Sequence, residues 1–314
     1  MTTFNSAEAY APASMGNVGV GFDILGLAFR EPGDTVRVNR RESKDVVIES
    51  IEGDNGILPR EAEKNTASVA VMTYLKTIDA PCGVSIALKK GLPLASGLGS
   101  SAASAVAAVV AVNALFGEPL KCEELLPACL DGEALVSGYH ADNVGPSLLG
   151  GITLITGTGI EDIYRLPVPE NMHFALVTPN VAVPTSEARA VLPQMIPLKQ
   201  MVDQTGAVAR LMDALYRGDL QATAEAMECD GVIEPARAHL MPLLNEARAL
   251  AKREGALSLV ISGAGPTLCA VCDTAEIAQH VADHLQSLYD DAGIGGISRA
   301  TQVDQTGAKV LNVL

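Results

Sequence analysis

Short runs in which apolar and polar residues alternate predict most of the strands. Residues 35–39 and 45–51 alternate and are rich in β-branched side chains, and the run 84–88 ends in Lys-Lys-Gly. A period of two turns one set of side chains toward the buried face of a sheet. Further strands are expected at residues 150–156, 173–178, 257–261, 268–271 and 309–313.

Apolar positions three and four residues apart predict the helices. The longest apolar stretch, residues 102–116, is rich in Ala and Val, and a helix is expected at residues 102–115, ending near Gly117 and Pro119. It is too short for a membrane span and reads as a buried helix. Further helices are expected at residues 120–137, 198–217, 220–229, 242–253 and 275–292. Strands and helices come in mixed order with few strand–helix–strand repeats, which favours an α+β fold over a doubly wound sheet.

The chain is long enough, at 314 residues, for two domains. Residues 166–171 carry two prolines and turn residues, so we place the boundary there. The expected domains are residues 1–166 and a C-terminal α+β domain at residues 167–314.

Composition narrows the class of partner. The formal net charge of −15 repels polyanions, which argues against nucleic acid and against an anionic membrane surface. Trp is absent and aromatics make up only 4%, so stacking platforms for single strands are not expected. The N-terminus lacks a basic region followed by an apolar run, and no signal peptide is predicted. Six scattered cysteines indicate reduced thiols and a cytoplasmic protein.

The most informative segment is residues 93–104, Pro-Leu-Ala-Ser-Gly-Leu-Gly-Ser-Ser-Ala-Ala-Ser, directly before the buried helix. Gly97 and Gly99 let the backbone come close to a ligand. Ser100 and Ser101 lie where the helix begins, and the free amides of the first turn favour a bound phosphate. The alternative is a capped helix after a flexible turn.

Two other glycine-rich segments can likewise be interpreted either as ligand-binding loops or as ordinary turns. In residues 12–23, Asn17 and Asp23 bracket two glycines on an expected loop that suits a small polar substrate. A turn in which both side chains bond their own backbone is equally compatible. Residues 262–267, Ser-Gly-Ala-Gly-Pro-Thr, are either a hairpin turn or a glycine wall against a phosphate or substrate.

Residues 140–143, His-Ala-Asp-Asn, place a base, an acid and an amide before a predicted strand, and Glu133 precedes them. A carboxylate such as that of Glu133 can take a hard cation beside a serine hydroxyl. The alternative for Glu133 is an exposed carboxylate on a helix.

Two arginines follow predicted turns, in Thr185-Ser-Glu-Ala-Arg189 and in Glu234-Pro-Ala-Arg237. A guanidinium fork binds a carboxylate through two hydrogen bonds, although a surface ion pair is the alternative for each. His280 and His284 have the spacing of a metal pair on a helix, but no third ligand is evident nearby, so a solvated helix face is expected there.

Taken together, these segments resemble the GHMP kinase superfamily. The superfamily carries an early Pro-x-Ser/Thr…Gly-x-Gly motif, a central Pro-x-x-x-Gly-Leu-Gly-Ser-Ser-Ala motif and a late Gly-x-Gly-Pro motif, and residues 12–267 present all three in this order. Residues 17–23, 140–143, 185–189 and 234–237 are most similar to the homoserine kinase family within it.

The resemblance implies two α+β domains, the first binding nucleotide, with the active site in the cleft between them. It implies transfer of phosphate from ATP, with Mg²⁺, to the side-chain hydroxyl of L-homoserine, and a homodimer. The residues that would bind ATP are Asn65, Lys90, Pro93, Leu94, Ala95, Ser96, Gly97, Leu98, Gly99, Ser100 and Ser101. Ser100 and Glu133 would hold Mg²⁺. The residues that would bind the substrate are Asn17, Asp23, His140, Asn143, Thr185, Arg189, Arg237 and Gly263. The candidate catalytic residues are Asp23, Asp142 and Asn143.

A mevalonate- or sugar-type kinase of the same superfamily is the first alternative function, and a non-catalytic nucleotide-binding relative is the second.

Overall fold

Two β-sheets organise the molecule in the computed structural model, which describes residues 4–314. The larger sheet has seven strands in the order β11-β1-β2-β4-β3, with β5 paired to β2 and β6 to β5. Its strands are β1 (Ser6–Gly16), β2 (Leu25–Arg40), β3 (Val46–Glu52), β4 (Val84–Lys89), β5 (Ile152–Ile155), β6 (Ile163–Leu166) and β11 (Lys309–Val313). The smaller sheet has the order β10-β7-β9-β8 and is formed by β7 (His173–Pro179), β8 (Ser258–Ile261), β9 (Leu268–Cys272) and β10 (Gly296–Gln302).

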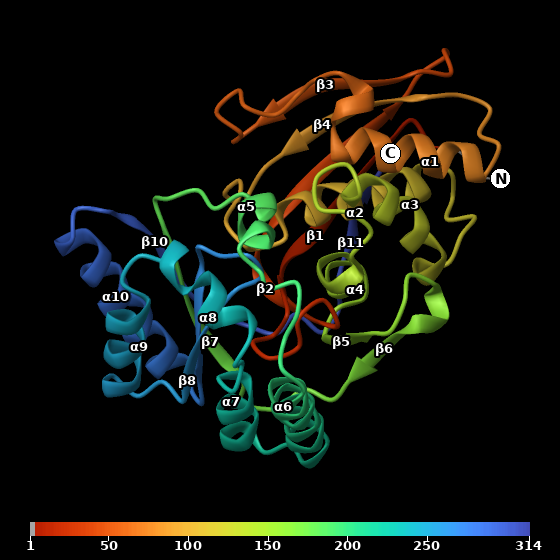
Figure 1. The fold of residues 1–314 in the computed structure, drawn as a ribbon. Coiled ribbons are helices and arrows are strands. Elements are labelled where there is room, and N and C mark those ends of the chain that lie inside the picture. The colour runs from red at the N-terminus through yellow and green to blue at the C-terminus, as the bar shows by residue number, and fades with distance from the viewer. Residues whose placement is uncertain (1–3) are drawn as a thin grey trace.

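Helices cover both sheets (Figure 1). Those packed against the larger sheet are α1 (Thr66–Thr77), α2 (Ser100–Leu115) and α4 (Ala141–Leu149), and α3 (Leu126–Glu133) packs on these three helices. The later helices are α5 (Thr185–Ala190), α6 (Leu198–Arg217), α7 (Leu220–Met227), α8 (Ile233–Arg237), α9 (Leu244–Arg253) and α10 (Ala275–Asp291). Short 3₁₀ turns lie at η1 (Ala62–Lys64), η2 (Cys122–Leu125), η3 (Ile160–Asp162) and η4 (Ala238–Leu240). Because α2 packs against β1, β2 and α1 at once, almost every residue of it is buried, as its Ala- and Val-rich sequence predicts.

One hydrophobic core extends from the larger sheet to one face of the smaller sheet, and a second core cluster lies between the smaller sheet and helices α9 and α10. The ring of Phe29 on β2 meets that of Phe174 on β7 edge to face, with centroids 5.3 Å apart, and both are fully buried. The chain passes from β6 to β7 across residues 167–172, which contain the predicted boundary, and its last strand, β11, returns to pair with β1. The assignment of domains to residues 1–166 and 167–314 stays a prediction.

Apart from one helix, the predicted strands and helices are present, with bounds that are unchanged for α6 and β11 and shifted by one or two residues for most others. The strand predicted at residues 35–39 is the end of the longer β2, which already begins at Leu25. The single helix predicted at residues 120–137 is wrong. The segment forms η2 and then α3, which has a proline in its first turn and ends at Glu133.

The early glycine motif is not wholly a loop as expected, because residues 12–16 are the end of β1. The alternating buried positions of β1 are filled by Ala7, Ala9 and Ala11, followed by Ala13. Alanine is a weak strand former, so the pattern gives little signal in the sequence.

The expectation that His280 and His284 have no third ligand nearby is also wrong. Glu254 follows α9, and its carboxylate lies 3.0 Å from Nε2 of His280 on α10. The contact joins residues 26 apart in the sequence, which spacing along one helix does not reveal.

Within residues 4–314, no helix combines the length and the apolar character that crossing a bilayer requires.

Candidate active site

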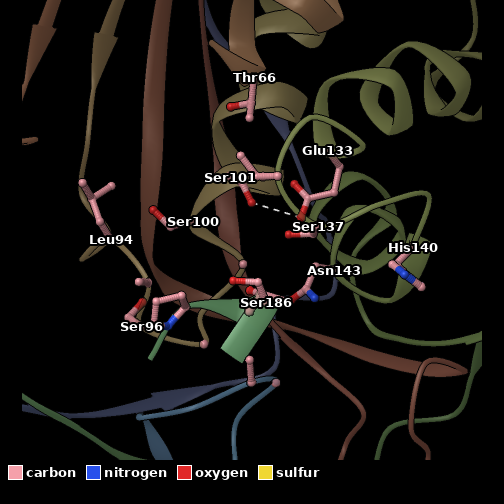
Figure 2. A pocket seen from close by; sticks show the side chains of 18 of the residues that line it. Thr66, Leu94, Ser96, Ser100, Ser101, Glu133, Ser137, His140, Asn143 and Ser186 are labelled. Carbon is pink, nitrogen blue, oxygen red and sulfur yellow. Dashed lines mark hydrogen bonds between the residues drawn. The ribbon is translucent and has the colours of Figure 1, made fainter. Parts of the chain in front are cut away.

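A cavity of about 370 Å³ lies where the start of α2 faces α3, α4 and α5 (Figure 2). Its volume is in the range of small-molecule sites. Most of the residues predicted from the sequence line it. They are Asn17, Asp23, Asn65, Lys90, Leu94, Ala95, Ser96, Gly97, Gly99, Ser100, Ser101, Glu133, His140, Asp142, Asn143, Thr185, Arg189, Arg237 and Gly263.

Pro93 and Leu98, which were predicted to bind ATP, are not among the lining residues. The carbonyl oxygen of Pro93 accepts a hydrogen bond from the Ser96 hydroxyl at 2.9 Å, which closes the turn. The Leu98 side chain is buried in the hydrophobic core. Both residues therefore contribute to the shape of the loop without lining the cavity.

The glycine loop takes its shape from the two other glycine segments. Gly97 and Gly99 have φ angles of 77° and 63°, which favour glycine. A Cβ on Gly97 would lie 2.3 Å from the carbonyl oxygen of Ser262, and the Ser262 hydroxyl donates to the Gly97 carbonyl at 2.8 Å. A Cβ on Gly99 would lie 2.2 Å from Oγ of Ser14. The three segments thus form one interlocked structure.

Two oxygen atoms that face this loop have no hydrogen-bond partner among the described residues, although both are buried: Oγ of Ser100 and Oε2 of Glu133. The other carboxylate oxygen of Glu133 accepts a hydrogen bond from the Ser101 hydroxyl at 3.0 Å (Figure 2). Burial raises the pKa of Glu133 to about 7. Glu133 is therefore not the exposed carboxylate of the alternative interpretation. A hydroxyl and a carboxylate oxygen are ligands suited to a hard cation such as Mg²⁺.

Lys90 lies beneath the start of α2 and is fully engaged by protein groups. Its ammonium donates to the carboxylate of Asp34, to the Ser100 carbonyl at 2.8 Å and to the Ser104 hydroxyl at 2.8 Å. An ammonium has three N–H donors, and all three are used here. Lys90 thereby ties β4 to the first turn of α2.

Asn65 is occupied in a similar way. Its amide oxygen accepts from the Ala67 amide at 3.0 Å and so caps α1, while its Nδ2 donates to the carbonyl of Pro59 at 2.9 Å. The capping explains why an asparagine stands at this helix start. Its contact with ATP stays a prediction.

The opposite end of the cavity carries paired charges. Arg189 on α5 binds Asp23 through two hydrogen bonds of 2.7 and 3.1 Å, which is fork geometry. Nδ1 of His140 lies 3.8 Å from the same carboxylate, and partial burial lowers the pKa of His140. Nε of Arg189 is buried without a partner among the described residues.

Arg237 on α8 is buried and points into the same region. Its Nε donates to the Ala188 carbonyl and its Nη1 to the Gly263 carbonyl, both at 3.0 Å. Nδ2 of Asn17 shares the Gly263 carbonyl, also at 3.0 Å. The guanidinium groups of Arg237 and Arg189 both lie over the ring of Phe22, with their Cζ atoms 5.3 and 5.5 Å from its centroid. Two cationic groups and one carboxylate thus meet in one place.

Asp142 and Asn143 lie on the first turn of α4, at the junction of these two regions. Burial, followed by the charge of Asp23, raises the pKa of Asp142 to about 7. Oδ1 of Asn143 accepts a hydrogen bond from the Ser14 hydroxyl at 3.1 Å. A buried carboxyl with a pKa near neutrality is able to exchange a proton at physiological pH.

Sequence reasoning missed several lining residues. They are Phe22, Leu58, Pro59, Lys64, Thr66, Ser104, Val136, Ser137, Pro184, Ser186 and Ala264. Phe22 directly precedes Asp23 in a motif that the sequence analysis already selects, so its position in that motif is a signal that identifies it. Most of the others flank predicted residues on turns whose direction only the fold decides.

Two family models match the chain, "GHMP kinases N terminal domain" over residues 65–151 and "GHMP kinases C terminal" over residues 211–291. The chain is 40% identical over 295 residues to a homoserine kinase of Chlorobium phaeobacteroides, a match that covers 90% of this chain and 92% of that protein.

Solved structures are similar over their whole length. A homoserine kinase from Cytophaga hutchinsonii superimposes with a TM-score of 0.94 at 40% identity, covering 99% of both chains. The mevalonate kinase of L. major has a TM-score of 0.71 at 16% identity, with 96% of this chain and 97% of that chain covered. That second similarity is one of fold alone.

Proposed function

Because the chain belongs to the homoserine kinase family of the GHMP kinases, we propose that it phosphorylates the side-chain hydroxyl of L-homoserine with ATP, giving O-phospho-L-homoserine and ADP. The name of the family implies a place in threonine biosynthesis. The observation that carries the proposal for this molecule is the composition of one cavity. Its first end is a glycine turn at a helix start, and its second end holds two arginines and an aspartate.

The turn formed by residues 94–101 is the proposed site of the ATP phosphates. Gly97 and Gly99 leave no side chain between the loop backbone and the cavity, and α2 starts directly after them. The amides of the first helical turn and the helix dipole favour negative charge at this point. Since the donors of Lys90 are all used within the protein, we propose that Lys90 holds the loop in place and does not itself bind a phosphate.

Ser100 and Glu133 are the proposed ligands of Mg²⁺. Each presents a buried oxygen that has no hydrogen-bond partner within residues 4–314 and is therefore available to a cation. When bound, Mg²⁺ supplies neutralisation of the negative charge on the transferred phosphoryl group.

The amino acid is proposed to bind at the other end of the cavity. A zwitterion offers a carboxylate to Arg189 and Arg237 and an ammonium group to Asp23, so each charge of the existing Asp23–Arg189 pair finds a substrate partner. Asn17, His140, Asn143, Thr185 and Gly263 complete the proposed substrate site. This supports an α-amino acid over a neutral sugar.

Phosphoryl transfer is proposed to depend mainly on alignment. The hydroxyl oxygen forms a bond to the γ-phosphorus while the bond from that phosphorus to the ADP oxygen breaks, and the hydroxyl proton leaves late, to a phosphate oxygen or water. Of the two candidate catalytic carboxylates, Asp142 is better suited than Asp23 to relay that proton to water, because Asp23 is held by Arg189 and the pKa of Asp142 is raised to about 7. Asn143, beside Asp142, is proposed to orient the reacting groups.

A panel of alcohols in a coupled ADP-release assay with Mg-ATP tests the function. L-homoserine is expected to give by far the highest kcat/KM among L-homoserine, L-serine, L-threonine, mevalonate and galactose. A preference for mevalonate or galactose would establish the alternative kinase class. Nucleotide binding without turnover of any alcohol would establish a non-catalytic relative.

A homodimer in the cytoplasm completes the proposal. The dimer rests on the family resemblance. The reducing compartment is supported by the six cysteines, all of which are free thiols in the structure.

A further inference from the structure

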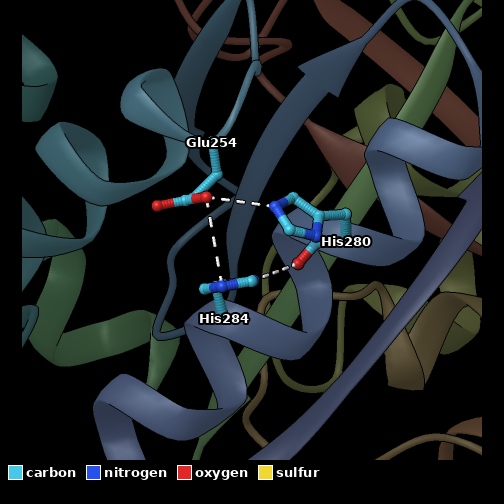
Figure 3. Close-up of side chains that lie close together, drawn as sticks. All are labelled: Glu254, His280 and His284. Atoms are coloured by element: carbon cyan, nitrogen blue, oxygen red, sulfur yellow. Dashed lines mark hydrogen bonds and ion pairs between the residues drawn. The ribbon is translucent and has the colours of Figure 1, made fainter.

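A cluster of metal-ligating side chains lies outside the cavity, where α9 ends beside α10 (Figure 3). It consists of Glu254, His280 and His284, and their ligand atoms all lie within 4.8 Å of one another. Both imidazoles project from one face of α10 toward the carboxylate, and both are substantially exposed, so an ion from solvent can reach them.

The distances suit a small tetrahedral ion. Oε2 of Glu254 lies 3.0 Å from Nε2 of His280 and 4.0 Å from Nε2 of His284. Ligands held at about 2.0–2.1 Å by a tetrahedral ion lie about 3.3–3.4 Å from one another. Small rotations of the exposed side chains therefore bring all three atoms to coordination distance.

A hydrogen bond to the backbone sets the orientation of one ring. Nδ1 of His284 lies 2.9 Å from the carbonyl oxygen of His280, and a carbonyl can only accept, so Nδ1 carries the proton of that bond. In the neutral imidazole the lone pair is then on Nε2, which faces the carboxylate oxygen of Glu254. Two acceptors that face one another need a proton or a cation between them. A hydrogen bond that fixes a histidine in this way is typical of metal ligands.

We propose that Glu254, His280 and His284 bind a divalent transition-metal ion of the Zn²⁺ class, with water at the remaining position. Two imidazole nitrogens and one carboxylate oxygen favour Zn²⁺, Ni²⁺ or Cu²⁺ over Mg²⁺, which takes oxygen ligands and keeps its waters. Arg253 donates to the other carboxylate oxygen at 3.0 Å, which leaves Oε2 as a single-oxygen ligand.

The ion would join two helices of the smaller sheet's outer layer. Glu254 ends α9 and the histidines lie on α10, and these helices pack against each other and the sheet. The site therefore acts as a clamp that stabilises this half of the molecule. The site is separate from the proposed Mg²⁺ ligands, so zinc binding there can be tested independently of the kinase activity.

Calorimetric titration of the full-length, chelator-treated protein with ZnCl₂ tests the proposal. One ion per chain is expected for the wild type. His284→Gln and Glu254→Gln are each expected to weaken zinc binding about tenfold or more. Loss of a residue that only hydrogen-bonds to a metal ligand already costs about tenfold, and loss of a ligand itself should cost at least as much. His239→Gln, which removes another exposed histidine, is the matched control and should bind like the wild type. Zinc should raise the melting temperature of the wild type and the control but not of His284→Gln.

The Co²⁺-loaded protein separates this site from the exposed thiol of Cys122. Visible d–d absorption without thiolate charge-transfer bands is expected. Unchanged zinc affinity in both His284→Gln and Glu254→Gln, a thiolate spectrum, or no saturable zinc binding to the wild type would each overturn the proposal. Kinase turnover with Mg-ATP, measured on the same variants, shows that they are folded.

Discussion

At the scale of single residues, three charged groups at one end of the cavity are held by other protein groups. Asp23 is held by Arg189 through two hydrogen bonds, and Arg237 is held by two backbone carbonyls. A bound zwitterion replaces one internal ion pair with two pairs to the ligand. The proposed site would therefore favour a substrate that carries both charges, because a ligand with only a carboxylate leaves Asp23 without a partner.

Arg237→Leu tests the proposed carboxylate contact. The variant is expected to raise the KM for L-homoserine about 30-fold or more, since the loss of a buried charged partner costs about 2–5 kcal/mol. The KM for ATP should change little. Steady-state kinetics measure both, with Arg210→Leu, an exposed arginine on α6, as the control. An unchanged KM for homoserine would refute the assignment.

Asp142→Asn tests the buried carboxyl on α4 through stability. The pKa of Asp142 is raised from 3.8 to about 7, so between these values the folded protein holds a proton that the unfolded chain has lost. The wild type's free energy of unfolding therefore decreases as pH rises through this window, by about 1.4 kcal/mol per pH unit from this group. Asparagine has no such titration.

Denaturant unfolding of both proteins from pH 4.5 to 7.5 checks this expectation. The difference between variant and wild type should move in favour of the variant as pH rises, and level off above pH 7. A difference that stays flat across the window would mean that Asp142 is ionised throughout.

At the scale of elements, the start of α2 depends on its neighbours. The glycine loop before the helix is held by the β8–β9 turn through Ser262 and by β1 through the bond from the Ser14 amide to the Leu98 carbonyl at 3.1 Å. The Lys90–Asp34 pair anchors it from below. A loop held on three sides is preorganised for its ligand, so little ordering is needed on binding.

Lys90→Met tests the anchor. Removal of one partner from a buried ion pair is expected to lower the free energy of unfolding by about 3–5 kcal/mol and, because the Ser100 carbonyl loses its donor, to raise the KM for ATP. The double variant Lys90→Met/Asp34→Asn should be less destabilised than the sum of the two single variants. Simple additivity in that cycle, or a KM for ATP equal to that of the wild type, would contradict the anchoring role.

At the scale of the whole molecule, one hydrophobic core runs between the two sheets. Phe29 and Phe174 belong to this core, as do Leu211 of α6 and Val303 after β10. The final strand also returns from the second half to pair with β1. The relative position of the two halves, and with it the shape of the cavity between them, is therefore fixed by burial.

Phe174→Ala tests this joint. A fully buried phenylalanine replaced by alanine is expected to cost about 3–5 kcal/mol of stability, whereas Ile297→Ala on the exposed face of β10 should cost far less. Because the core is shared, denaturant unfolding of the wild type should show one cooperative transition for both halves. Two separate transitions, or equal losses in the two variants, would argue against the joint.

The sequence by itself determined the features that depend on near neighbours. Apolar periodicity places α2, α6 and α10, and the motif at residues 93–102 places a glycine loop at a helix start, since the spacing of residues along one helix or turn decides both. The same motif also indicates the GHMP kinase superfamily. The cavity is lined by nearly all the residues chosen in this way.

Only the tertiary structure decided which side chains meet. Asp23 and Arg189 pair across 166 residues, Lys90 meets Asp34 across 56, and Glu254 joins the histidines of α10 from another helix. Such contacts depend on how sheets and helices pack, which local propensity does not encode. The energy of packing and of buried charge therefore selects the partners, and it gives Lys90 three hydrogen-bond acceptors within the protein.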